Sequence, residues 1–220
     1  MLKHPVNLVI FDKDGLIMDT EAPVHLVWAR VFKRWGLKEL TLKTYAKFIG
    51  FDRKKNISQV EELFPGVDAE ALLNECGVEV REHLLNNPIG TMPGLFELLD
   101  FLDEKGIKKA IATSSRYENA KLTLEKCGIF HRFDTIISGD MVARSKPAPD
   151  IFLKACEVLK VPVDESLVLE DSNAGVQAAY AAGIPVIVIP DLVEPSIETL
   201  SLCEQRCKNL SEVIHILQNL

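Results

Sequence analysis

Short apolar runs alternate with helix-like patterns along most of the chain. The first run, residues 6–11, is nearly continuous and rich in β-branched residues, which is typical of a strand buried on both faces of a parallel sheet. Similar runs recur at residues 107–112, 135–137, 167–169 and 185–189. The alternation predicts an α/β fold, a doubly wound, Rossmann-like parallel sheet with right-handed crossovers.

Helical patterns fill the intervals between these runs. They cover residues 94–105, 117–127, 148–159 and 174–182. Gly106, Gly128 and Gly183 stand just after three of them, where a helix commonly ends on a residue with positive φ. The C-terminal residues 211–220 predict a closing amphipathic helix.

The interval from Thr20 to Asn87 breaks this rhythm, because it contains no clear strand pattern. Its first part carries an apolar stripe at helical spacing, formed by Val24, Val27, Trp28, Val31, Phe32 and Trp35. Helical patterns follow at residues 58–64 and 69–85. We therefore expect a helical module at residues 20–87, inserted into a sheet domain made of residues 1–19 and 88–220.

The composition is that of an ordinary globular protein. Hydrophobic residues make up 47% of the 220 residues and charged residues 26%, which excludes disordered and low-complexity classes. The formal net charge of −7 argues against nucleic acid as a partner, because phosphate backbones select lysine and arginine. A small phosphorylated ligand is compatible with this charge when a cation mediates its binding.

Cysteine usage and hydropathy bear on the compartment. The five cysteines are odd in number and lack a framework spacing, so we expect reduced thiols in a cytoplasmic protein. The most apolar stretch, residues 178–190, is short and contains Gly183 and Pro185, so we expect no membrane span. The first apolar run is too short for a secretory signal and ends in an acid, so we expect none.

Polar residues follow the ends of four predicted strands, where open α/β sheets bind ligands. They are Asp12 and Asp14 after the first strand, Thr113 and Ser114 after the second, Lys146 beyond the third, and Glu170 and Asp171 after the fourth. Carboxylates gathered this closely repel one another, and a divalent cation would relieve the repulsion. Oxygen ligands favour Mg²⁺ over zinc. This set is typical of phosphoryl transfer, in which a carboxylate can also be the nucleophile.

The same residues form four motifs. They read Asp12-Lys13-Asp14-Gly15 with Asp19-Thr20 shortly after, Ile111-Ala112-Thr113-Ser114, Lys146-Pro147, and Glu170-Asp171. Each motif is weak alone, but the order and the strand ends make the set specific. Together they resemble the haloacid dehalogenase-like hydrolase superfamily. The resemblance implies an inserted helical cap at residues 20–87, similar to those of β-phosphoglucomutase, phosphoglycolate phosphatase and sugar-phosphate phosphatases.

The resemblance implies a role for each motif residue. Asp12 is expected to be the nucleophile that forms an aspartyl-phosphate, and Asp14 the general acid and then base, with a raised pKa. Thr113, the Ser114 amide and Lys146 are expected to hold the phosphoryl oxygens.

The resemblance also implies a metal site and a substrate-contacting loop. Asp12, the Asp14 carbonyl and Asp171 are expected to bind Mg²⁺, with Glu170 acting directly or through water. In the cap, Arg53 is expected to contact the distal part of the substrate.

These roles predict a cytoplasmic Mg²⁺-dependent phosphatase, active as a monomer on a small sugar or nucleoside phosphate. One alternative is a mutase similar to β-phosphoglucomutase. That family has a histidine four residues after the hinge threonine, where this chain has Val24, with His25 one place late. The other alternative is a non-enzymatic receiver module that accepts a phosphoryl group on Asp140, which the long insertion opposes.

Overall fold

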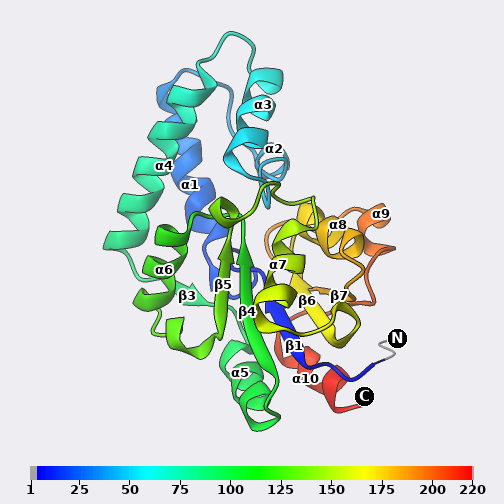
Figure 1. Ribbon diagram of the computed structural model, residues 1–220. Helices are drawn as coiled ribbons and strands as arrows, with labels where there is room; N and C mark the ends of the chain where they lie inside the picture. Colours follow the sequence, from blue (N-terminus) through cyan, green and yellow to red (C-terminus); the bar gives the residue numbers. More distant parts are fainter. Residues whose placement is uncertain (1–3, 220) are drawn as a thin grey trace.

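The computed structural model describes residues 4–219, and its centre is a six-stranded parallel sheet (Figure 1). The strand order is β5-β4-β1-β6-β7-β8. The bounds are β1 Leu8–Phe11, β4 Lys108–Thr113, β5 Thr135–Ser138, β6 Ser166–Glu170, β7 Val186–Val188 and β8 Gln205–Arg206. The predicted α/β class and the five predicted strands are confirmed. The short edge strand β8 has no apolar run and was not predicted.

The register of the sheet places the expected site residues at one edge. Phe11, the last residue of β1, pairs with Ile111 of β4 on one side and with Leu169 of β6 on the other. The chain therefore leaves these three strands at nearly the same level. Asp12, Thr113 and Glu170 consequently come to the same end of the sheet, although they are far apart in sequence.

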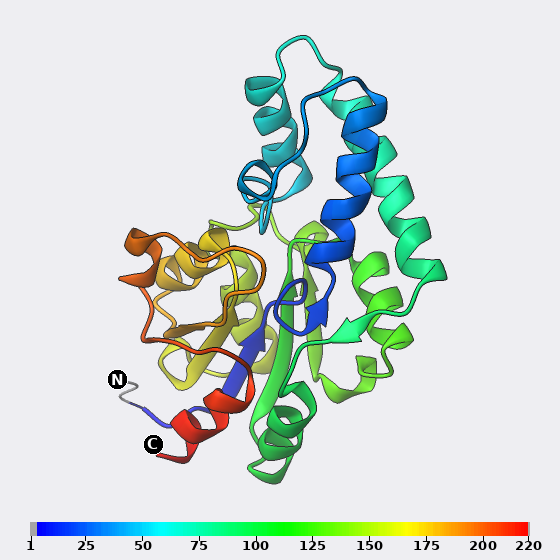
Figure 2. The same cartoon turned by 180° about the vertical axis from the view of Figure 1, so that it is seen from behind.

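Helices cover both faces of the sheet (Figures 1 and 2). One face packs against α5 (Leu95–Glu104), α6 (Tyr117–Lys126) and α10 (Ser211–Gln218), and the other against α7 (Asp150–Leu159) and α8 (Asn173–Ala181). Alternate side chains of β1 enter the two cores: Val9 and Phe11 enter the first, Leu8 and Ile10 the second. This two-sided burial explains why the strand reads as a continuous apolar run.

The helical patterns match the observed helices to within a few residues. Gly106, Gly128 and Gly183 all have positive φ, as expected after a helix end. Short elements without a sequence pattern complete this part: α9 Ile197–Leu200 and the 3₁₀ turns η1 Phe130–Arg132, η2 Gly139–Met141 and η3 Val163–Glu165. Among the helices of residues 4–219, none combines the length and the apolar character needed to cross a membrane.

Four helices lie beyond the carboxyl ends of the strands (Figure 1). They are α1 Glu21–Arg34, α2 Leu42–Tyr45, α3 Arg53–Leu63 and α4 Ala69–Asn86. These α1–α4 helices share a hydrophobic cluster of their own, which includes Phe32, Val60 and Leu72. The chain enters and leaves them through two short antiparallel strands, β2 Met18–Asp19 and β3 Gly90–Thr91.

Candidate active site

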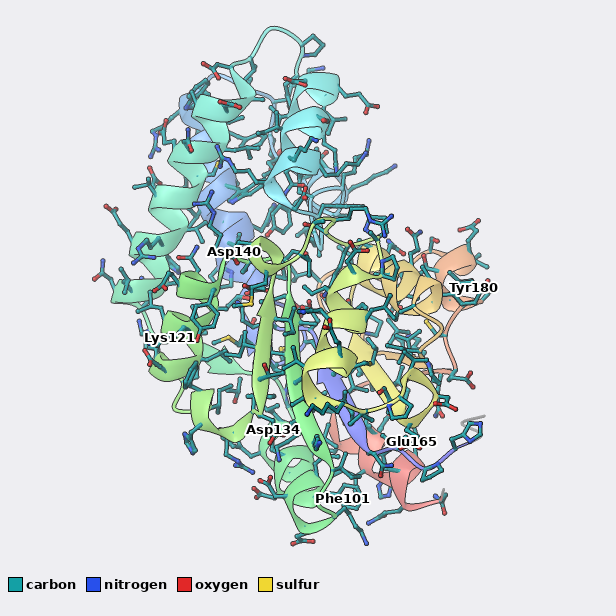
Figure 3. The ribbon with its side chains drawn as sticks, viewed as in Figure 1. Phe101, Lys121, Asp134, Asp140, Glu165 and Tyr180 are labelled. Atoms are coloured by element: carbon teal, nitrogen blue, oxygen red, sulfur yellow. The ribbon has the colours of Figure 1, made fainter. Side chains whose placement is uncertain are left out.

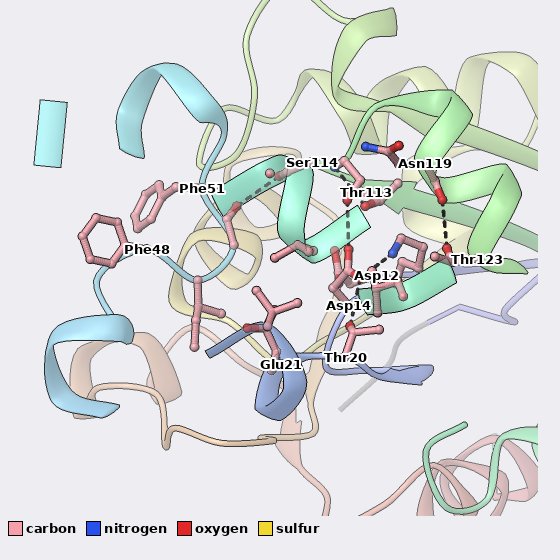
Figure 4. A pocket seen from close by; sticks show the side chains of 18 of the residues that line it. Asp12, Asp14, Thr20, Glu21, Phe48, Phe51, Thr113, Ser114, Asn119 and Thr123 are labelled. Atoms are coloured by element: carbon pink, nitrogen blue, oxygen red, sulfur yellow. Dashed lines mark hydrogen bonds and ion pairs between the residues drawn. The ribbon is translucent and has the colours of Figure 1, made fainter. Parts of the chain in front are cut away.

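A cavity of about 290 Å³ lies between the carboxyl edge of the sheet and the α1–α4 helices. Asp12, Asp14, Thr113, Ser114 and Asp171 all line it. Figure 4 shows Asp12 and Asp14 near its centre, with Thr113 and Ser114 close by. Five of the eight residues expected at the site are therefore brought together around one space.

The turn after β1 brings Asp171 close to the Asp12–Asp14 segment. Gly15 has a φ of +79°, and a Cβ at this position would lie 2.4 Å from Asp171 Oδ2. Only glycine fits both this conformation and this close approach. The glycine of the first motif thus makes room for the acid of the fourth.

Lys146 lies beneath Asp12 rather than in the cavity wall. Its side chain is buried, and its ammonium donates to Asp12 Oδ1, to Glu170 Oε1 at 2.6 Å and to Ala112 O at 2.9 Å. A lysine ammonium has three N–H groups, and these contacts use all of them. In this structure Lys146 therefore holds Asp12 in place. We expected its ammonium to contact the phosphoryl oxygens of the substrate.

Glu170 is fully buried and does not reach the cavity. Its Oε1 accepts from Lys146, and its Oε2 accepts from the Asp171 amide at 3.0 Å and from Ser172 N and Oγ at 3.1 and 2.9 Å. Both oxygens are thus committed to protein donors. We expected Glu170 at the metal, either directly or through water; in this structure both of its oxygens accept from protein donors, and its bonds to Asp171 and Ser172 hold the loop after β6.

Burial shapes the acidity of the two innermost aspartates. Burial raises the pKa of Asp12 to about 7, against the opposing charge of Lys146, and the charges of Glu170 and Asp14 add to the rise. The pKa of Asp171 is raised well above its ordinary value by burial, and then by the charges of Glu170 and Asp12. Such a cluster of carboxylates favours either protons or a bound cation.

Asp14 behaves in the opposite way to our expectation of a raised pKa. Burial alone would raise its pKa, but the Lys13 ammonium and hydrogen bonds from Lys13, Thr20 and Ser115 outweigh burial and lower it. The Thr20 and Ser115 hydroxyls donate to Asp14 at 2.9 and 3.0 Å. Asp14 is therefore ionised at neutral pH in the free protein.

The second motif supplies hydroxyl groups to the cavity. Thr113 Oγ1 is buried and accepts from the Ser115 amide at 3.1 Å, which leaves its own proton available to a ligand. Ser114 Oγ donates to Gly50 O at 3.0 Å. Gly50 belongs to the loop before α3, so this bond joins the sheet to the α1–α4 helices.

Two residues considered from the sequence lie elsewhere. Arg53 begins α3 on the surface, where its guanidinium donates to Glu70 O at 3.1 Å and Asn74 Oδ1 at 2.8 Å, and it does not line the cavity. Asp140 lies on the exposed turn after β5 (Figure 3) and accepts from Ser138 Oγ at 2.6 Å. The structure brings neither residue to the site.

Glu21 and Tyr45 line the cavity and were not predicted. The Tyr45 hydroxyl donates to Glu21 Oε2 at 2.8 Å. Burial raises the pKa of Glu21 to about 8, helped by the charge of Asp14. The only sequence signal for Glu21 is an acid directly after the Asp19-Thr20 pair, and none marks Tyr45.

The residues at this edge suit a magnesium ion that is bound by only a few protein ligands. Within residues 4–219 no three His, Cys, Asp or Glu side chains are grouped to hold a metal, and Glu170 is committed to other partners. The Asp12 and Asp171 carboxylates with the Asp14 carbonyl remain as hard oxygen donors. Mg²⁺ in proteins commonly takes one or two carboxylates and keeps several waters, so this smaller set suits it.

A parallel α/β sheet with carboxylates at its carboxyl edge, beneath a group of helices, is typical of α/β enzymes whose active site lies at the strand ends. Comparison with known proteins gives the family. Residues 9–189 match the model of the haloacid dehalogenase-like hydrolases, and the chain belongs to that family.

Named relatives and solved structures agree with this assignment. The chain is 32% identical over 81% of its length to a phosphorylated carbohydrates phosphatase of Thermotoga maritima, covering 82% of it. It is 31% identical to a fructose-1-phosphate phosphatase of Escherichia coli, with coverages of 81% and 94%. A putative β-phosphoglucomutase from Thermotoga maritima superposes with a TM-score of 0.75 at 28% identity, covering 98% of this chain and 100% of that one. The chain is therefore an enzyme of the haloacid dehalogenase-like hydrolase family, and both named relatives are phosphatases.

Proposed function

We propose that the protein is a Mg²⁺-dependent phosphatase that hydrolyses a small phosphorylated metabolite, a sugar or nucleoside phosphate, through an aspartyl-phosphate on Asp12. The observation that carries the proposal is the position of Asp12. It stands at the end of β1 in the cavity wall, with Lys146 fixed behind it and Asp14 beside it.

The reaction takes two steps. In the first, an oxygen of Asp12 attacks phosphorus, the ester P–O bond breaks, and Asp14 gives its proton to the leaving oxygen. In the second, Asp14 takes a proton from water, the resulting hydroxide attacks phosphorus, and the Asp12–phosphorus bond breaks to release inorganic phosphate. Asp14 is ionised in the free protein, and the negative charge of an arriving phosphate favours its protonated form.

The surrounding residues position the reacting groups. Lys146 and Glu170 hold Asp12 from below, and the Thr113 hydroxyl and the Ser114 amide are available as donors to the phosphoryl oxygens. The Asp12 and Asp171 carboxylates and the Asp14 carbonyl would bind Mg²⁺. When bound, this ion would neutralise charge on the phosphoryl group.

The α1–α4 helices are proposed to act as a cap, with residues 20–87 as the cap domain and residues 1–19 and 88–220 as the core domain. The β2–β3 pair is where the two connections cross, so it is the natural hinge. A closed cap excludes bulk water and admits only small substrates. All proposed groups come from one chain, so the working unit is proposed to be a monomer.

A mutase is the second candidate, because the chain is similar to a putative β-phosphoglucomutase. The cavity argues for hydrolysis instead. Val24 lines it at the position where the mutase family has a histidine. His25 points elsewhere, with its Nε2 2.7 Å from Leu40 O.

Phosphate release from a panel of sugar and nucleoside phosphates, measured with Mg²⁺ and with EDTA, tests the proposal. We expect Asp12→Asn to lower kcat by at least ~1,000-fold, since the nucleophile is lost. The matched control is Asp140→Asn, an aspartate after a neighbouring strand but outside the cavity, which should stay within about twofold.

Two further results bear on the mechanism. Rapid acid quenching followed by mass spectrometry should locate a phosphoryl group on Asp12. Full activity in Asp12→Asn, or no phosphate release by the wild type across the panel, would contradict the proposal. Appearance of an isomerised sugar phosphate faster than free phosphate would favour the mutase.

A further inference from the structure

One side of the cavity is formed by two facing helices, α4 of the cap and α6 of the core. The residues of α4 that line it are spaced as one helical face: Gly77, Val80, Arg81 and Leu84. The residues of α6 follow the same rule: Asn119, Leu122 and Thr123. In Figure 4, Asn119 and Thr123 lie on one side of Asp12 and Asp14, and Phe48 and Phe51 lie on the other.

Arg81 differs from the other cation of this cavity. Among the described residues that line the cavity, the cations are Lys13 and Arg81. Lys13 is buried and paired with Asp14. Arg81 is exposed at the cavity and has no ion pair with a carboxylate of residues 4–219 within 4.0 Å.

The structure gives Arg81 a neutral partner. Its Nη1 donates to Asn119 Oδ1 at 2.7 Å, which uses one of the five N–H groups of a guanidinium. The remaining N–H groups can donate two parallel hydrogen bonds to an oxyanion, which is the ligand that matches guanidinium geometry. Leu84 and Leu122 beside this contact are apolar, so an oxyanion that arrived here would meet no competing acid from them.

The acidic residues in the rest of the cavity further favour binding of a second anion at Arg81. Asp12, Asp14, Glu21 and Asp171 all line the cavity. A substrate with a second negative group would be repelled if that group lay near these acids. At the α4–α6 wall the same group would meet Arg81, so the phosphate and the second anion would bind at separate places.

We propose that Arg81, supported by Asn119, is a specificity-determining residue that binds a second oxyanion on the leaving group of the substrate. The preferred substrates are phosphate monoesters whose leaving group carries an anionic group, such as a carboxylate or a second phosphate. A short carbon chain joins this anionic group to the ester oxygen. This inference rests on the proposed phosphatase function and adds the class of ester that the site selects. Because Arg81 is on the cap and Asn119 on the core, the contact forms only when the two helices face each other.

The test uses alkyl phosphates of two, three and four carbons, each ending in a hydroxyl, a carboxylate or a second phosphate. For at least one chain length, we expect an anionic ester to exceed the hydroxyl ester by ~10-fold or more in kcat/KM. Arg81→Met should reduce this ratio to about one, mainly through KM, and Arg81→Lys should retain part of it. The carboxylate and phosphate series show which oxyanion the site takes.

Arg53→Met is the matched control, because Arg53 is an exposed arginine of the same helices that lies outside the cavity. It should keep the wild-type ratio. The inference is overturned if no anionic ester is preferred, if the preference survives Arg81→Met, or if p-nitrophenyl phosphate is hydrolysed and all nine alkyl esters are not. Absence of hydrolysis of every ester, including p-nitrophenyl phosphate, contradicts the proposed function itself.

Discussion

At the scale of single residues, the site depends on small side chains that leave space for charged ones. Gly175 lies in the first turn of α8, and a Cβ there would be 1.8 Å from the Glu170 Cδ. The Glu170 carboxylate occupies this space, and from it binds Lys146, which in turn holds Asp12. The position of the proposed nucleophile therefore depends on a glycine that never touches the cavity.

This dependence predicts opposite effects for two helical glycines. Gly175→Ala should lower the free energy of unfolding by more than about 3 kcal/mol and abolish activity, because the methyl group displaces the Glu170 carboxylate. Gly77→Ala in α4 has no atom within 4 Å of the new methyl group and should raise stability by about 0.5–1 kcal/mol. Urea unfolding of both variants checks this, and equal effects would contradict it.

Glu21 predicts a pH dependence of stability. Its pKa is about 8 in the folded protein against an ordinary value of 4.5, so the neutral form is favoured by folding. The stability that this provides is complete below pH 4.5 and is lost as the pH rises through 8. Glu21→Gln should therefore gain stability relative to wild type between pH 5 and pH 9, by on the order of 1–3 kcal/mol.

Urea unfolding of the two proteins in EDTA at pH 5, 7 and 9 measures this difference. Glu61→Gln on α3 is a matched control, because Glu61 is an exposed acid of the same group of helices. A constant difference between Glu21→Gln and wild type at the three pH values would show that Glu21 is not held neutral.

At the scale of elements, α6 connects the core to the end of α4. Lys126, the last residue of α6, donates to three backbone carbonyls there: Leu84 at 2.5 Å, Leu85 at 2.6 Å and Asn87 at 2.7 Å. The last carbonyls of a helix have no partners within the helix, and a cation near them is favourable. A single surface lysine thus fixes the point where the chain leaves α4 and returns to the sheet.

Removal of this contact should loosen α4 locally. Lys126→Met should lower the free energy of unfolding by about 1 kcal/mol and increase amide hydrogen exchange in the last two turns of α4. Lys121→Met is the control on the same helix (Figure 3), because the contacts of Lys121 are with Glu125 at 3.9 Å and with the Phe130 ring, 6.0 Å from its centroid. Unchanged exchange in α4 of Lys126→Met would contradict the assignment.

At the scale of the whole molecule, the candidate site concentrates negative charge between the carboxyl edge of the sheet and the α1–α4 helices. Asp12 and Asp171 are buried together, and both have raised pKa values because of burial and of neighbouring acids. Without a cation, this arrangement destabilises the folded chain as the acids ionise. Sites of this kind commonly exchange stability for function.

Asp171→Asn should therefore raise the stability of the metal-free protein and abolish its activity. In EDTA at neutral pH it should raise the free energy of unfolding by about 1–2 kcal/mol, because one buried charge is removed. It should also lose the stabilisation that millimolar Mg²⁺ gives the wild type, together with phosphatase activity. The exposed Asp164→Asn should change none of these, as thermal unfolding with and without Mg²⁺ will show. A Mg²⁺ effect that persists in Asp171→Asn would contradict the proposed ligand set.

Most of the sheet could be predicted because its strands are buried on both faces and read as apolar runs. The strands that could not be predicted, β2, β3 and β8, have two residues each and carry no pattern of their own. The pairing of β2 with β3 depends on where the chain enters and leaves the α1–α4 helices, and the pairing of β8 depends on the free edge of β7. The short helices α2 and α9 could not be predicted either, because four residues cannot show a helical period.

The sequence by itself determined which residues follow the strand ends, and so which acids, hydroxyls and lysine gather at one edge. It could do so because parallel strands run in the same direction, so their carboxyl ends lie at the same edge of the sheet. Tertiary structure alone decided which of these residues face the cavity. Lys146 and Glu170 are buried beneath Asp12, Arg53 turns to Asn74, and Arg81 faces Asn119. Hydrogen bonds between residues far apart in the chain determine where a side chain points, and no local pattern encodes them.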